Sequence, residues 1–335
     1  VRQVLLSHPH DGPPLEFPVS LPVPVRVPDG QVLDLISGHR VRAVALDAPG
    51  TGYEVAGPDG ERLLYLPPEG AVAGLEQSGG PYETVLVDVV GRPDGLARLR
   101  AAGAVGPGTD VVAVHLDHDV APAEELRRRL AAAGARTVPD GTTLTVGRYP
   151  DVPEPPRRTL VLGGARSGKS LEAERLLATY PDVRYVATGG RRDGDPDWAA
   201  RVAAHRARRP GSWRTTETCD LVPLLTDVEG GPLLIDCLAL WFTDAMDAVE
   251  AWDDDQWERG GARALAKRAA EFAAAVRETR RTVVLVSNEV GSGVHPATPA
   301  GRRFRDELGR LNATVAAECE TVLLAVAGVV TPLRA

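Results

Sequence analysis

A glycine-rich stretch of eight residues carries the clearest chemical signal in the sequence. The stretch reads Gly163, Gly164, Ala165, Arg166, Ser167, Gly168, Lys169 and Ser170, which satisfies the pattern G-x-x-x-x-G-K-[ST]. In such a loop the backbone N–H groups turn inward to hold phosphate oxygens, the lysine reaches the β- and γ-phosphates, and the hydroxyl of the last residue binds Mg²⁺. The spacing therefore predicts a site for a nucleoside triphosphate and Mg²⁺.

The residues on either side of this loop predict the elements that must hold it. Residues 159–162 form a short apolar run typical of a buried parallel strand, and residues 170–179 have the amphipathic pattern of a helix. A position between a strand and a helix is the context that the motif requires. The alternative, a glycine turn followed by a surface lysine, is therefore disfavoured.

An acidic residue, Asp236, ends a second apolar run at 233–235. Phosphotransferases with a glycine-rich loop use an acidic residue at the end of a buried strand to order the metal or its waters. An aspartate in this position can also be a turn residue or a helix cap. The loop upstream favours the first role, so we expect Lys169 and Asp236 to act together in catalysis.

One histidine, His205, lies in the arginine-rich helical stretch 201–209. Neighbouring positive charges lower the pKa of an imidazole, and a neutral imidazole can attack phosphorus while arginines hold the phosphates. The alternative is a surface or packing histidine, which is the commoner role of a lone histidine on a helix. The residue pattern alone leaves both interpretations open.

Apolar runs and helical patterns alternate through the C-terminal half. The runs lie at 184–187, 233–235, 282–287 and 321–326, and helical patterns cover 261–280 and 302–318. Such alternation is typical of a mostly parallel sheet with helices on its faces. We therefore predict an α/β, RecA-like P-loop domain at 159–335.

The N-terminal half is also predicted to be α/β, with more strands. Strand-like pieces lie at 4–6, 41–46, 62–66, 85–89, 111–114 and 143–146, and a helical pattern covers 121–133. A proline-dense stretch at 149–158 cannot continue a helix and separates the halves. The expected organisation is a domain at 1–148, a linker at 149–158 and the P-loop domain.

Composition narrows the class of protein. Nowhere do the roughly 18 uninterrupted apolar residues of a membrane span occur, and the start has no secretory signal pattern. The three cysteines lack C-x-x-C spacing, which disfavours disulfide and zinc frameworks. The net charge of -8 offers no basic surface for nucleic acid. We expect a cytoplasmic protein. The absence of an initiator methionine indicates either a trimmed start or a GTG start codon read as valine.

The C-terminal half resembles a known family along nearly its whole length. The matching pieces are 162–170, 185–188, 200–202, His205, 209–210, 213–215, Glu217, 234–238, 286–294, 304–306 and 309–312. Together they resemble adenosylcobinamide kinase/adenosylcobinamide-phosphate guanylyltransferase, an enzyme family of cobalamin biosynthesis. Such a combination of pieces is far more specific than the glycine-rich loop alone.

This resemblance implies two reactions on one corrinoid. The hydroxyl of adenosylcobinamide is phosphorylated by ATP or GTP, and GMP from GTP is then transferred to adenosylcobinamide phosphate with release of pyrophosphate. A guanylylated histidine is implied at His205, with Mg²⁺ at Ser170, and the family's assembly implies a trimer. The GTP pocket implied beside the loop consists of Thr188, Gly189, Gly190, Arg206, Ala207, Arg208, Arg209, Glu217 and Asp236.

The N-terminal half resembles the later part of a metallo-β-lactamase fold. Candidate metal ligands are His8, His10, Asp11, His115, Asp117 and His118, and Pro139-Asp140-Gly141 precedes the expected last strand. The family's H-x-H-x-D-H motif is incomplete here, because Gly12 follows Asp11. A proline-rich segment with Glu69 stands where the family supplies a bridging aspartate. Both departures predict a degenerate domain.

Two alternative functions remain open on the sequence. A P-loop protein that uses GTP as a regulatory switch is disfavoured, because no glutamine is placed to orient an attacking water. A metal-dependent phosphodiesterase activity of the N-terminal half requires three or more convergent ligands.

Overall fold

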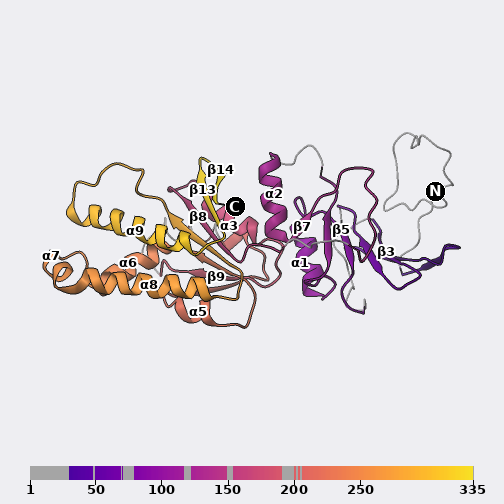
Figure 1. Ribbon diagram of the computed structural model, residues 1–335, viewed down its shortest axis with the longest axis horizontal. Helices are drawn as coiled ribbons and strands as arrows, with labels where there is room; N and C mark the ends of the chain where they lie inside the picture. The colour runs from indigo at the N-terminus through magenta and orange to yellow at the C-terminus, as the bar shows by residue number, and fades with distance from the viewer. Residues whose placement is uncertain are drawn as a thin grey trace. The chain divides into compact units, whose positions relative to one another are not determined.

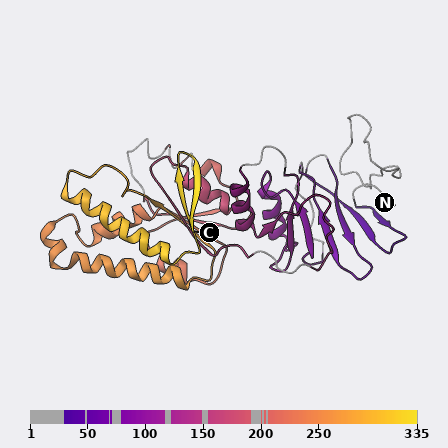
Figure 2. The same cartoon turned by 45° about the horizontal axis from the view of Figure 1, so that its top comes forward.

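The computed structural model describes residues 30–47, 50–68, 70, 79–116, 122–148, 154–190, 200, 203 and 206–334. The chain forms two compact units. We call them the N-terminal unit (Val1–Pro155 with Ala178–Pro181) and the C-terminal unit (Pro156–Leu177 with Asp182–Ala335). Figures 1 and 2 show the elements of each unit from two directions.

A seven-stranded sheet forms the centre of the C-terminal unit (Figure 1). Its strands are β8 (Arg158–Gly163), β9 (Arg184–Ala187), β10 (Arg214–Glu217), β11 (Leu233–Asp236), β12 (Val283–Asn288), β13 (Thr321–Val326) and β14 (Val329–Arg334). They lie in the order β10-β9-β11-β12-β8-β13-β14, and every pairing is parallel except that of β13 with β14. The mostly parallel sheet predicted from the sequence is confirmed.

Helices cover this sheet, which explains why its central strands have continuous apolar runs. The helices are α3 (Lys169–Leu176), α5 (Val222–Thr226), α6 (Leu238–Ala248), α7 (Asp254–Gln256), the π-helical segment η2 (Trp257–Gly261), α8 (Ala262–Glu278) and α9 (Pro299–Ala317). Helices α8 and α9 lie side by side in both views (Figures 1 and 2). In the middle of the sheet, Val161, Ile235 and Leu285 are fully buried.

The carboxyl ends of six parallel strands lie at one edge of this sheet. The register pairs Glu217 with Ala187, Ala187 with Asp236, and Asn288 with Gly163. In parallel α/β sheets, ligands bind outside the carboxyl ends of the strands. The predicted phosphate-binding loop and Asp236 therefore lie at the same edge, separated by strand β12.

The N-terminal unit contains a second sheet, whose seven strands follow one another in sequence order. The strands are β1 (Val32–Asp34), β2 (Arg40–Val44), β3 (Gly52–Ala56), β4 (Arg62–Tyr65), β5 (Thr84–Val87), β6 (Asp110–Ala113) and β7 (Ala135–Arg136). Strands β1 to β4 pair antiparallel, and β4 to β7 pair parallel. Helices α1 (Pro93–Ala101) and α2 (Ala123–Ala133) precede β6 and β7.

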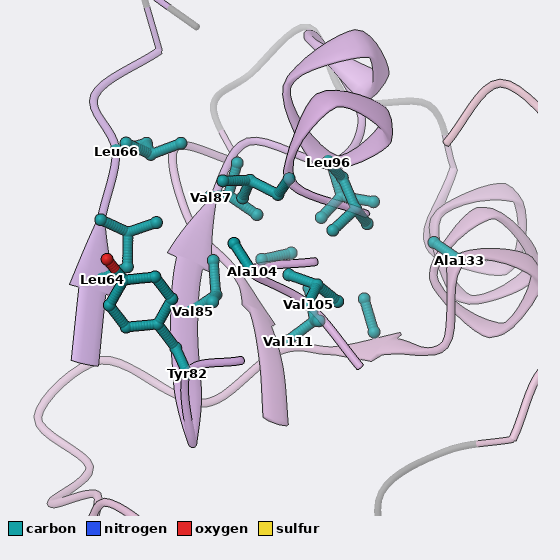
Figure 3. Close-up of a cluster of buried hydrophobic side chains, with 14 of the residues drawn as sticks. Leu64, Leu66, Tyr82, Val85, Val87, Leu96, Ala104, Val105, Val111 and Ala133 are labelled. Atoms are coloured by element: carbon teal, nitrogen blue, oxygen red, sulfur yellow. The ribbon is translucent and has the colours of Figure 1, made fainter. Parts of the chain in front are cut away.

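Apolar side chains from this sheet and its two helices form one core (Figure 3). Leu64 and Val85 come from neighbouring strands, Leu96 from α1 and Ala133 from α2, and each is almost completely buried. The α/β class predicted for this half of the chain is therefore confirmed. Its likeness to metallo-β-lactamases and the expected boundaries at 1–148 and 149–158 stay predictions.

One predicted strand, at 143–146, is wrong. The segment pairs with no strand among the described residues and lies between two turns, which are closed by the N–H of Thr142 to the carbonyl of Pro139 and by the N–H of Arg148 to the carbonyl of Thr145, both at 3.1 Å. The second turn uses the Thr145 carbonyl, a group that a sheet ladder would need. The strand expected at 4–6 lies outside the described residues.

Candidate nucleotide-binding site

The glycine-rich loop connects β8 to α3, as its motif requires. Two of its residues have left-handed backbone angles, Arg166 with φ 57° and Gly168 with φ 97°. Alternation of left- and right-handed residues turns successive N–H groups toward one side and makes a concavity that suits anions. The ammonium of Lys169 donates to the carbonyl of Gly164 at 3.0 Å and so lies across the loop.

Main-chain hydrogen bonds from two neighbouring segments of the chain fix the loop. The carbonyl of Gly163 accepts the N–H of Glu289, at the end of β12, at 3.1 Å. The carbonyl of Ser167 accepts the N–H of Gly328, in the turn between β13 and β14, at 2.9 Å. The loop shape is thus set by main-chain bonds to both strands that flank β8.

Gly163 sits where no side chain fits. A Cβ at this position would lie 2.6 Å from the carbonyl oxygen of Ala325 on β13 and 2.4 Å from the hydroxyl of Ser167. At the next residue, Gly164, a Cβ would have no heavy atom within 4 Å. Gly163 therefore allows close packing against β13, whereas Gly164 leaves open space in front of the loop.

Oxygen donors of the kind that Mg²⁺ prefers are present at this edge. Ser170 lies in the first turn of α3, half-buried, and Asp236 ends β11 on the far side of β12. The hydroxyl of Ser167 is buried and has no hydrogen-bond partner within the described part of the chain. A hydroxyl, a carboxylate and a polar loop fit a hydrated Mg²⁺ with triphosphate oxygens, which needs only one or two protein ligands.

Asp236 is fixed from the side by strand β9. The hydroxyl of Tyr185 donates to its Oδ2 at 2.9 Å. Burial, together with the negative charge of Asp236, raises the pKa of Tyr185, so this hydroxyl stays a proton donor at neutral pH. Thr188 fixes Cys237, the residue that follows Asp236. Its hydroxyl donates to the carbonyl of Cys237 at 2.7 Å and accepts the N–H of Cys237 at 3.0 Å.

Residues 206–209, the last four of the arginine-rich stretch, are anchored to the same edge. Arg208 donates twice to the buried carboxylate of Glu174 on α3, at 3.1 and 3.3 Å. Arg206 pairs with Glu217 at 3.3 Å. The guanidinium of Arg209 lies over the ring of Tyr185, 3.6 Å from its centroid, and burial lowers its pKa.

The structure therefore brings together most of the residues singled out in the sequence. The residues on or beside the carboxyl edge of the sheet are Gly163 to Ser170, Thr188, Arg206, Arg208, Arg209, Glu217 and Asp236. Next to them in the chain are Gly189, Gly190 and Ala207, which are partly or fully exposed. His205 lies outside the described residues.

Some contributors to this edge were not assigned as site residues from the sequence. Tyr185 and Glu289 occur inside matching pieces, but their contacts depend on strand order. Buried Asn312 of α9 accepts the hydroxyl of Ser287 at 2.6 Å and donates to the carbonyl of Asn288 at 3.0 Å. A buried asparagine in an otherwise apolar helix face was the one available signal.

Of the metal ligands suggested for the N-terminal unit, the structure describes only His115. His115 is bonded through Nε2 to the hydroxyl of Tyr65 at 3.1 Å. Among the described residues, no group of three or more His, Cys, Asp or Glu side chains could hold a metal ion. Candidates outside the described residues are His8, His10, Asp11, Glu69, Asp117 and His118.

The fold and site of the C-terminal unit define a P-loop enzyme that transfers phosphoryl groups from nucleotides. Comparison with known proteins gives its family: the family described as Cobinamide kinase / cobinamide phosphate guanyltransferase matches residues 159–333. The chain belongs to this family, and it is a bifunctional kinase and guanylyltransferase of cobalamin biosynthesis. The first 158 residues lie outside the matched range.

Curated relatives cover the same half of the chain. The bifunctional adenosylcobalamin biosynthesis protein CobP of Pseudomonas aeruginosa is 42% identical over 181 residues, which is 53% of this chain and 97% of the relative. The proteins of the same description named CobU, from Salmonella typhimurium and Escherichia coli, are each 37% identical over 175 residues, or 51% of this chain and 96% of theirs. In the part of the chain that the structure describes, no helix is both long and apolar enough for a membrane span.

Proposed function

We propose that this single sheet edge performs both reactions, with the loop holding the triphosphate and His205 carrying GMP between GTP and the corrinoid phosphate. The observation that carries the proposal is the anchoring of residues 206–209. Arg208 is bound to the helix of the phosphate-binding loop, and Arg209 lies over the tyrosine that holds Asp236. His205 directly precedes this stretch in the sequence, which supports its role as the carrier of GMP.

In the kinase step, the γ-phosphoryl group of ATP or GTP passes to the hydroxyl of adenosylcobinamide. The loop N–H groups and Lys169 would hold the β- and γ-phosphates and stabilise the charge that develops on the leaving group. Ser170 and Asp236 would hold Mg²⁺ directly or through water, and the ion, when bound, neutralises phosphate charge. Tyr185 keeps Asp236 oriented for this role.

In the guanylyl step, a neutral imidazole nitrogen of His205 attacks the α-phosphorus of GTP. The P–N bond forms, the bond from the α-phosphorus to the bridging oxygen breaks, and pyrophosphate leaves. An oxygen of adenosylcobinamide phosphate then attacks the same phosphorus, the P–N bond breaks, and His205 returns to its starting state. Two steps in one site require the nucleotide or the histidine segment to shift between them.

Two further proposals concern the setting of these reactions. The supply of ATP and GTP supports a cytoplasmic location. The family resemblance supports a trimer, which the molar mass in solution tests directly.

The experiment that tests the histidine uses GTP labelled at the α-phosphate. Wild type is expected to form an acid-labile, alkali-stable adduct that maps to His205. The variant His205→Ala should lose the adduct and keep kinase turnover, whereas the control His39→Ala, altered in the N-terminal unit, should keep both. Survival of the adduct in His205→Ala would overturn the assignment.

A further inference from the structure

The carboxyl end of β12 occupies the central position at the active edge. Strand β12 lies between β8, which leads into the phosphate-binding loop, and β11, which ends in Asp236. The register pairs Asn288 with Gly163, and Val286 with Asp236. The residue after the strand, Glu289, therefore stands between the loop and the metal-ordering aspartate.

Main-chain bonds fix Glu289 in this place. Its N–H donates to the carbonyl of Gly163 at 3.1 Å, and the preceding carbonyl, of Asn288, accepts the amide of buried Asn312 at 3.0 Å. Its side chain is half-buried, and Oε1 accepts the N–H groups of Gly291 at 2.6 Å and Ser292 at 3.3 Å. The carboxylate is thus held by its own turn beside the first glycine of the loop.

Three other carboxylates near this edge have strong partners. Glu174 binds Arg208, Glu217 binds Arg206, and Asp236 accepts the hydroxyl of Tyr185. Within the described residues, Glu289 has neither a cationic nor a hydroxyl partner, and its Oε1 accepts only the two N–H groups of its own turn. Its other carboxylate oxygen, Oε2, accepts no hydrogen bond from the described residues and is available as an acceptor for a substrate hydroxyl.

We propose that Glu289 is the general base of the kinase step. The substrate hydroxyl oxygen attacks the γ-phosphorus, the new P–O bond forms, and the bond from the γ-phosphorus to the β,γ-bridging oxygen breaks, so that the nucleoside diphosphate leaves. The hydroxyl proton passes to Oε2 of Glu289. The guanylyl step needs no such base, because its nucleophiles are a neutral imidazole and an ionised phosphate.

The variant Glu289→Gln separates this role from a structural one. Glutamine keeps an Oε1 that accepts the N–H groups of Gly291 and Ser292, so the turn and the support of Gly163 remain, while the proton acceptor is lost. Loss of a general base typically costs 10²–10⁴-fold in rate. The inference rests on the loop holding the triphosphate as proposed above.

The test measures both half-reactions in the full-length chain. In Glu289→Gln we expect kcat for phosphorylation of adenosylcobinamide to fall about 100-fold or more, with KM for the nucleotide and the rate of GMP adduct formation unchanged. The control is Glu278→Gln, which removes an exposed carboxylate at the end of α8 and should match wild type. Its loss of one negative charge equals that of the test variant.

Kinase turnover in Glu289→Gln equal to that of wild type would overturn the inference. So would an equal fall in kinase turnover and in the rate of GMP adduct formation, which would indicate a role in nucleotide binding. If Glu289→Gln does not fold, Glu289→Ala decides, because formate should restore its kinase activity and formamide should not. Failure of both compounds would also overturn the base role. A wild-type chain that forms no adduct would instead contradict the role of His205, and the kinase turnover of Glu289→Gln against that of Glu278→Gln would then decide the base role.

Discussion

The pair of glycines that opens the phosphate-binding loop allows a test on neighbouring residues. Neither Gly163 nor Gly164 has a left-handed φ, so alanine causes no backbone strain at either position. The surroundings differ. At position 163 an added Cβ meets the main-chain carbonyl of Ala325 at 2.6 Å, whereas at 164 it meets nothing within 4 Å.

The expected cost of Gly163→Ala follows from what must move. Ala325 pairs directly with Gly163 across the β8–β13 ladder, so its carbonyl cannot withdraw without disturbing that ladder. Overpacking of this kind costs about 1–3 kcal/mol. The lower entropy of the unfolded alanine chain returns about 0.4–1 kcal/mol. We expect a net loss of about 1–2 kcal/mol in the free energy of unfolding of the C-terminal unit.

Urea unfolding followed by tryptophan fluorescence reports on this unit selectively, because every tryptophan of the chain lies at position 198 or beyond. With a typical slope of about 1–3 kcal/mol per molar urea, the midpoint of Gly163→Ala should fall by about 0.5–1 M. Gly164→Ala meets no clash, so it should be as stable as wild type or more stable by about 0.4–1 kcal/mol. Its defect should be in GTP binding, since the new methyl group faces the open side of the loop.

Equal urea midpoints for Gly163→Ala and wild type would refute the packing argument. So would equal destabilisation by Gly163→Ala and Gly164→Ala, which would show that flexibility of the loop, and not the Ala325 carbonyl, requires glycine at this position.

Three further predictions concern side chains behind the site. Tyr185→Phe removes the hydrogen bond to Asp236 and should lower kinase kcat about tenfold, or about 1.4 kcal/mol, with little change in KM for the nucleotide; an unchanged kcat would contradict the orienting role. Arg208→Met leaves the buried carboxylate of Glu174 without its partner and should lower the free energy of unfolding by about 1–3 kcal/mol, as measured by the urea midpoint, whereas a neutral result would show that the pair is not needed. Burial raises the pKa of the Cys237 thiol to about 11, above its usual value of about 8.5, so the stabilisation it adds is present below about pH 8.5 and is lost as pH rises toward 11. The difference in urea midpoint between wild type and Cys237→Ala should therefore shrink between pH 8 and pH 11, and a pH-independent difference would contradict this.

Much of the C-terminal unit could be predicted because its signals are local. The apolar runs at 184–187 and 321–326 match strands β9 and β13 residue for residue. Strands buried on both faces have continuous apolar sequences, and the glycine-rich loop has a fixed spacing. The phosphate-binding role of the loop could therefore be predicted from its spacing and from the apolar strand before it.

The elements that were missed have weak local signals. Strand β10 reads Arg-Thr-Thr-Glu and is largely exposed at the sheet edge, and β14 contains Pro332 and exposed apolar residues. Such strands form because a neighbouring strand offers backbone partners, which periodicity cannot reveal. The contacts of Tyr185 with Asp236 and of Glu289 with Gly163 depend in the same way on strand order.

The turn at Ala327 and Gly328 is a site at which the phosphate-binding loop can be altered by protein engineering. Its N–H group at position 328 holds the carbonyl of Ser167, yet the turn itself belongs to the hairpin of β13 and β14. A small ligand-responsive peptide inserted there would reshape the phosphate-binding loop from outside, without altering any residue proposed to contact nucleotide. Cobamide assembly could in this way be placed under the control of an added compound.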